Sequence, residues 1–99
     1  MRPGDPEHDP VVRELRDRIT AADRALLAAV NDRVGLVREL RAHKLEQGWD
    51  FVDRRREEHL VDALARENPG PLSEAGLREL FAGVLALSKR EAGGAEDDR

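Results

Sequence analysis

The sequence predicts an all-α protein: a three-helix protomer with one long N-terminal helix, paired with a second copy as a homodimer. Apolar residues recur at helical spacing in three stretches separated by glycine and proline. Aromatic residues make up only 3 % of the 99 residues, so the core must be aliphatic and interhelical. At ~1.5 Å per residue the first stretch, 11–47, makes a rod on the order of 55 Å. A compact monomer of this size has a radius of gyration of about 13 Å, so the rod needs a partner to cover it.

The first helix is predicted over 11–47. Asp9 can cap it with Pro10 at the first helical position, and Gly48 can end it in the left-handed conformation. At ~100° per residue, eight apolar residues project within roughly 40° of one line and form a core-facing stripe. These residues are Val12, Leu15, Ile19, Ala22, Leu26, Val30, Val37 and Leu40.

Two cations interrupt this stripe. Arg33 falls between Val30 and Val37, and Lys44 extends the stripe one turn beyond Leu40. Burying a charge without a partner costs several kcal/mol, so each cation needs an anion or a route to water. Two interpretations are open at this stage. Each cation either reaches solvent or an internal acid on its long stem, or it faces an anionic ligand.

The second helix is predicted to begin at Asp50 or Asp53, after a short connection over 49–52, and to end by Asn68 before a Pro-Gly-Pro run. Its apolar line, projected backwards, passes through Glu57 and Asp53. Asp53 also suits an N-cap, and Glu57 suits a first-turn acid favoured by the helix dipole. Capping and a role in a site are compatible for Asp53. The line itself consists of Leu60, Val61 and Leu64.

The third helix is predicted to begin after Ser73 as N-cap and to end at the glycine pair 93–94. Ser88 lies within its apolar arc, Glu91 near it and Ala92 at its edge. A serine in such an arc commonly bonds the carbonyl four residues back, which is one interpretation of Ser88. The apolar face comprises Leu77, Leu80, Phe81, Val84 and Leu87.

Each helix therefore carries polar residues inside its apolar stripe, which favours one shared polar pocket within the bundle. Nucleophilic thiol chemistry is excluded because there is no cysteine, and the histidines lack metal-ligand spacing. There is no glycine-rich phosphate loop. A cationic pocket of this kind suits a small polyanion such as a dicarboxylate, and we expect no cofactor and no metal.

Charge and hydropathy limit the partners and the compartment. The net charge is −4 with dispersed acids, which argues against nucleic acid. No apolar run approaches the ~20 residues of a membrane span, and the N-terminus does not resemble a signal peptide. We expect a cytoplasmic protein with a disordered lead-in over 1–10, a helical domain over 11–92 and a disordered acidic tail over 93–99.

A set of residues is spread over nearly the whole chain: Leu15, Arg16, Ile19, Asp23, Leu26, Leu27, Arg33, Lys44, Asp53, Arg56, Glu57, Phe81 and Ser88. This set resembles the all-helical class of chorismate mutases. The segment ENPGPLSEAGLRELF also resembles mutase domains fused to the first enzyme of the shikimate pathway. This resemblance implies an intertwined homodimer that rearranges chorismate to prephenate for phenylalanine and tyrosine biosynthesis, with a partner enzyme of that pathway as a further possibility.

The resemblance also implies roles for the cations of the first helix. Arg16 would cross the dimer to hold a substrate carboxylate in the partner's pocket, and Arg33 would hold the other carboxylate within its own chain. Lys44 would donate to the ether oxygen, where negative charge develops. Arg16 projects ~100° away from Arg33 on the helix, which agrees with a cross-dimer arrangement.

On the other two helices the resemblance implies a lining of the pocket by Asp53, Arg56 and Glu57. Glu57 would accept a hydrogen bond from the substrate hydroxyl and act as a catalytic residue together with Arg33 and Lys44. Ser88 would contact a substrate carboxylate.

The chain departs from the family pattern at Ala92, where many members have a glutamine as the second donor to the ether oxygen. Glu91, one residue earlier, could replace it only if it is protonated and if the last helical turn shifts. Several explanations are open: a slower mutase completed by a partner enzyme, an aminodeoxychorismate mutase, or an isochorismate-pyruvate lyase. A non-catalytic helical dimer with a regulatory role is the alternative from a different class.

Overall fold

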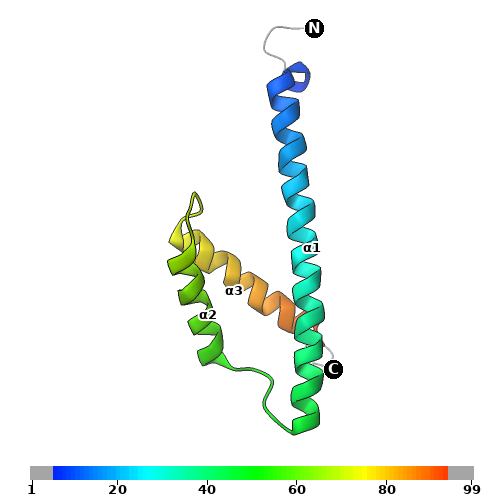
Figure 1. The fold of residues 1–99 in the computed structure, drawn as a ribbon, viewed down its shortest axis with the longest axis vertical. Helices are drawn as coiled ribbons and strands as arrows, with labels where there is room; N and C mark the ends of the chain where they lie inside the picture. The colour runs from blue at the N-terminus through cyan, green and yellow to red at the C-terminus, as the bar shows by residue number, and fades with distance from the viewer. Residues whose placement is uncertain (1–5, 94–99) are drawn as a thin grey trace. The chain divides into compact units, whose positions relative to one another are not determined.

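The computed structural model describes residues 6–93, which form a short 3₁₀ turn and three α-helices with no strand among them (Figure 1). The turn is η1 (Pro6–His8), and the helices are α1 (Pro10–Gln47), α2 (Arg54–Glu67) and α3 (Glu74–Glu91). The all-helical, three-helix prediction is therefore confirmed. The disorder expected over 1–5 and 94–99 lies outside the described residues. No helix in the described part of the chain combines the length and apolar character that a membrane crossing requires.

The chain divides into two units, residues 1–31 and 32–99, which are described separately. In the first, η1 occupies part of the stretch expected to be a lead-in, and α1 begins at Pro10 as expected. The carboxylate of Asp9 caps this helix because it accepts hydrogen bonds from the backbone N–H groups of Val11, at 2.7 Å, and Val12, at 3.2 Å.

The apolar stripe of this first unit faces solvent. Leu15, Ile19 and Leu26 are 47 %, 59 % and 55 % exposed. Single exposed leucines are ordinary on protein surfaces, but a row of them along one helix face is not. In the single chain, the stripe is therefore an apolar surface that remains exposed to water.

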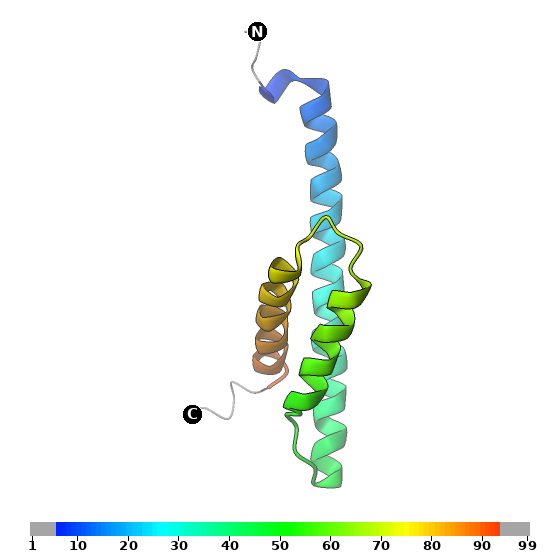
Figure 2. The same ribbon diagram turned by 90° about the vertical axis from the view of Figure 1, so that its left-hand side faces the viewer.

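The second unit consists of the end of α1 followed by the antiparallel pair α2 and α3 (Figure 2). Asp53 is the N-cap of α2, with its carboxylate accepting from the N–H of Arg56 at 3.0 Å, so the helix begins at the later of its two expected positions. Ser73 caps α3 by accepting from the N–H of Gly76 at 3.0 Å. Both caps are confirmed, as is the left-handed Gly48 with a φ of 74°.

The end of α3 is attached to α1. Arg38 donates to the backbone carbonyl of Glu91 at 3.1 Å. Leu77, Ala92 and Ser88 are the buried residues of the described chain, at 4 %, 6 % and 1 % exposure. Because two of these three lie in the last turns of α3 or just after it, the best-packed part of the unit is the C-terminal end of α3, where Arg38 of α1 contacts it.

Candidate active site

A pocket in the second unit draws its walls from all three helices and from the connection between α1 and α2. Apolar side chains form part of the wall, while the remaining positions carry charge or a hydroxyl. The lining residues are Arg33, Val37, Leu40, Lys44, Phe51, Val52, Asp53, Arg56, Glu57, Leu60, Leu85, Ser88 and Lys89. Six of the residues expected from the sequence are therefore brought together: Arg33, Lys44, Asp53, Arg56, Glu57 and Ser88.

Arg33 lies half-buried in the pocket wall and forms no hydrogen bond or ion pair with any described residue. The internal ion pair considered for it is thus absent from the described part of the chain. A guanidinium group carries five N–H donors in a planar fork that fits a carboxylate. Arg33 is accordingly available to bind an anion that enters the pocket.

Lys44 is also half-buried, and its ammonium group donates to the backbone carbonyl of Phe51 at 3.1 Å. An ammonium group has three protons, so two remain for a ligand. The contact ties Lys44 to the connection that follows α1. It also gives the Lys44 ammonium group one hydrogen-bond acceptor, which is a backbone carbonyl rather than a carboxylate.

Asp53 combines two roles in one position. Its carboxylate caps α2 through the N–H of Arg56, and the same residue lines the pocket. The cap fixes the first turn of α2, from which both Arg56 and Glu57 project. Asp53 is thus both the N-cap of α2 and part of the pocket lining, and its role toward a ligand stays a prediction.

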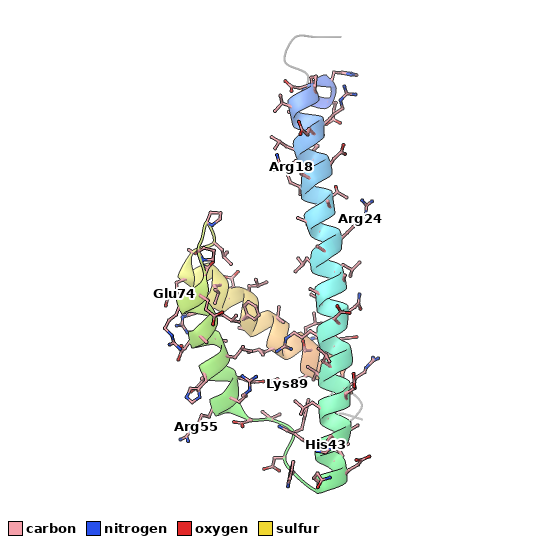
Figure 3. The ribbon with its side chains drawn as sticks, viewed as in Figure 1. Arg18, Arg24, His43, Arg55, Glu74 and Lys89 are labelled. Carbon is pink, nitrogen blue, oxygen red and sulfur yellow. The ribbon has the colours of Figure 1, made fainter. Side chains whose placement is uncertain are left out.

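Glu57 is paired with Lys89, a residue that the sequence analysis did not identify. The Lys89 ammonium lies 3.2 Å from Oε1 and 3.1 Å from Oε2 of Glu57. Figure 3 labels Lys89 beside the C-terminal part of α3. Lys89 could have been noticed because it follows Ser88 and stands one turn after Leu85, which also lines the pocket.

Ser88 bonds within its own helix. Its hydroxyl donates to the carbonyl of Val84 at 2.7 Å, and the residue is 1 % exposed. This is the arrangement that a serine on an apolar helix face commonly adopts. Contact with a ligand carboxylate requires the hydroxyl to turn away from Val84.

Two residues considered for the site do not line this pocket. Arg16 belongs to the first unit, where it forms an ion pair with Glu7. The carboxylate of Glu91 lies 3.7 Å from Arg90, and its side chain is 54 % exposed. The structure thus gives no support to Glu91 as a donor within the pocket.

The titratable groups outside this pocket form no metal site within the described part of the chain. Among the described residues, no cluster of three or more histidine, cysteine or acidic side chains is arranged to hold a metal. Hydrogen bonds from Arg78 to Glu74 and then to Asp62 raise the pKa of Arg78. Arg78 does not line the pocket: its ion pair with Asp62 connects α2 with α3, and its ion pair with Glu74 lies within α3.

The fold and the pocket together define a small helical protein with a pocket lined by cations between its helices. The family model of chorismate mutase type II matches residues 15–92, and the chain belongs to this family of isomerases. The resemblance seen in the sequence is therefore confirmed.

Two solved structures are similar to the chain, forms I and II of the chorismate mutase from Thermus thermophilus. Each is 31 % identical, covers 78 % of this chain and superposes with a TM-score of 0.76. The match spans 96 % of the form I chain and 88 % of the form II chain. No match was found among curated protein sequences.

Proposed function

We propose that this chain catalyses the rearrangement of chorismate to prephenate, in the cytoplasm and in aromatic amino-acid biosynthesis. The observation that supports the proposal is the pocket of a family member in which Arg33, which has no partner among the described residues, lies with Lys44 and Glu57. The reaction is intramolecular and needs no general base, covalent intermediate, cofactor or metal. It needs the enolpyruvyl arm folded over the ring and the ether oxygen stabilised as its bond to the ring breaks.

Arg33 and Lys44 supply these two requirements. The Arg33 guanidinium binds one substrate carboxylate through paired hydrogen bonds, which fixes the arm in a reactive orientation. The two free protons of Lys44 are directed to the ether oxygen. A fixed donor at a developing negative charge typically contributes ~3 to 4 kcal/mol to lowering the barrier.

The remaining residues complete the lining. Glu57 accepts a hydrogen bond from the hydroxyl of the ring, while Asp53 and Arg56 hold the first turn of α2 against the ligand. Ser88 contacts a substrate carboxylate after its hydroxyl leaves the carbonyl of Val84.

The working enzyme is proposed to be a homodimer. Its support is the exposed apolar stripe on the first unit, with Leu15, Ile19 and Leu26 about half or more exposed. Covering such a stripe is favourable by roughly 25 cal/mol for each Å² of apolar surface removed from water. In the proposed dimer, Arg16 of a second copy leaves Glu7 and clamps the second carboxylate of the substrate.

The test is the loss of chorismate absorbance on adding the purified protein, with identification of prephenate as the product and Arg33→Ala as the control. Turnover by the wild type and its loss in the variant are expected. An inactive wild-type protein with a dimer confirmed by sedimentation would contradict the proposal.

Aminodeoxychorismate is a second candidate substrate, and one observation favours it. Ala92 occupies the position where many family members have the second donor to the ether oxygen, so the pocket is not the usual one. Preferred turnover of aminodeoxychorismate over chorismate in the same assay would establish this candidate. A non-catalytic module is disfavoured because a scaffold would gain stability from replacing Arg33 and Lys44 with leucine.

A further inference from the structure

We infer that Lys89 is a positioning residue of this active site, which holds the carboxylate of Glu57 toward the substrate and balances its charge. The inference rests on the proposed function. Lys89 comes from α3 and Glu57 from α2, 32 residues apart in the sequence. The ammonium group contacts both carboxylate oxygens, at 3.2 and 3.1 Å, so it fixes the plane of the carboxylate as well as its position.

The ion pair of Glu57 and Lys89 belongs to the linings of two hollows. Glu57 and Lys89 line the pocket and also a second, more open hollow between α2 and α3. A glutamate side chain has several staggered rotamers of similar energy, so an unpaired Glu57 could turn into either hollow. Contact with Lys89 selects one arrangement before the ligand arrives.

The charges of the pocket point to the same role. Four cations line it, Arg33, Lys44, Arg56 and Lys89, against two acids, Asp53 and Glu57. The excess of two positive charges equals the charge of a dicarboxylate. The Glu57 and Lys89 side chains are only 25 % and 33 % exposed, so water screens them incompletely. Without Lys89, the excess of cations over acids in the lining would fall to one, and Glu57 would lose the ion pair that faces its carboxylate.

A direct bond from Lys89 to the substrate is the competing explanation, and a double-mutant cycle separates the two. If Lys89 acts through Glu57, replacing it matters only while position 57 carries a carboxylate. The cycle uses Lys89→Met, Glu57→Gln and their combination, with kcat and KM for chorismate measured in each. Glu57→Gln keeps an amide oxygen that accepts from the hydroxyl, so its activity should stay measurable.

We expect Lys89→Met to lower kcat/KM about tenfold, the scale of one misplaced charged hydrogen bond. In the Glu57→Gln background the same replacement should cost less than about twofold. Lys89→Arg should stay within about threefold of the wild type because it restores a cation with parallel donors. The matched control is Arg90→Met, which removes the neighbouring exposed cation that does not line the pocket and should leave kcat/KM unchanged.

Circular dichroism and thermal unfolding show whether each variant keeps the fold, and Lys89→Gln replaces Lys89→Met if the latter does not fold. A folded Lys89 variant with wild-type kcat/KM would overturn the inference. An equal loss in the Glu57→Gln background would also overturn it, in favour of a direct substrate contact. A wild type inactive on chorismate overturns both the proposed function and this inference, whereas an active wild type with an unaffected variant overturns only the latter.

Discussion

The hydroxyl of Ser88 donates to the carbonyl oxygen of Val84 at 2.7 Å, inside α3 and out of contact with water. A substrate carboxylate must therefore compete with a bond that already exists. The net gain from exchanging one hydrogen bond for another is small. Ser88 is thus the member of the proposed site whose removal should matter least.

We predict that Ser88→Ala lowers kcat/KM by less than about tenfold and changes the free energy of unfolding by about 1 kcal/mol or less. Steady-state kinetics and urea unfolding measure the two quantities. Ser73→Ala is the matched control, because it removes the N-cap of α3 and should cost about 1 kcal/mol of stability without changing the kinetics. A hundredfold kinetic loss in Ser88→Ala would contradict the prediction and assign the serine a dominant substrate contact.

Arg33→Ala should lower kcat/KM by about 100-fold or more, because the substrate arm loses the clamp that orients it. Helix content should persist, since Arg33 has no partner among the described residues. Kinetics and circular dichroism of the same preparation check both statements. Arg24→Ala is the control, because Arg24 is an exposed cation of α1, labelled in Figure 3, that does not line the pocket. Unfolding of Arg33→Ala would show instead that the arginine has a structural partner.

Ala92→Gln should raise kcat if the missing second donor limits the rate. Ala92 follows the last turn of α3, its N–H bonds the Ser88 carbonyl at 2.9 Å, and it is 6 % exposed. A gain of about tenfold is the scale expected for one added donor to the ether oxygen. Ala92→Met is the matched variant, similar in length but without an amide. Equal kcat in both variants would mean that size rather than hydrogen bonding is responsible, or that another substrate is used.

We predict that formation of the homodimer depends on the exposed apolar stripe of α1. Ile19→Asp should convert the proposed dimer to a monomer in sedimentation and abolish turnover, because it places a charge on the surface to be covered. Ala28→Asp is the control, with the same change of charge ~180° around the helix. A monomeric wild type, or an Ile19→Asp variant that stays dimeric and active, would contradict the prediction.

Most of the fold could be predicted from local sequence signals. Asp53, Ser73 and Gly48 mark helix boundaries through capping and φ preference, which act over a few residues. Helical periodicity likewise placed Arg33 and Lys44 on the face that lines the pocket. The short turn η1 was missed because proline and acids there indicated an unstructured lead-in.

The contacts that join one helix to another could not be predicted from the sequence. Lys89 projects toward the flank of the apolar face of α3, and periodicity does not tell which residue on α2 it meets. The same holds for Lys44 and the carbonyl of Phe51, since backbone groups carry no sequence signature. For Ser88 the sequence left two interpretations open, and the helix-internal bond is the one observed.

The bond from Lys44 to the Phe51 carbonyl has a consequence for redesign of the chain. An inserted or deleted residue between Gly48 and Asp53 would shift the carbonyl that steadies a pocket cation, so this connection has a fixed length. The turn after α2 contains hydrogen bonds among its own residues, because the Asn68 side chain donates to the Leu72 carbonyl and accepts from the Gly70 N–H. New chain ends, tags or inserted domains belong in that turn, where they leave the pocket untouched.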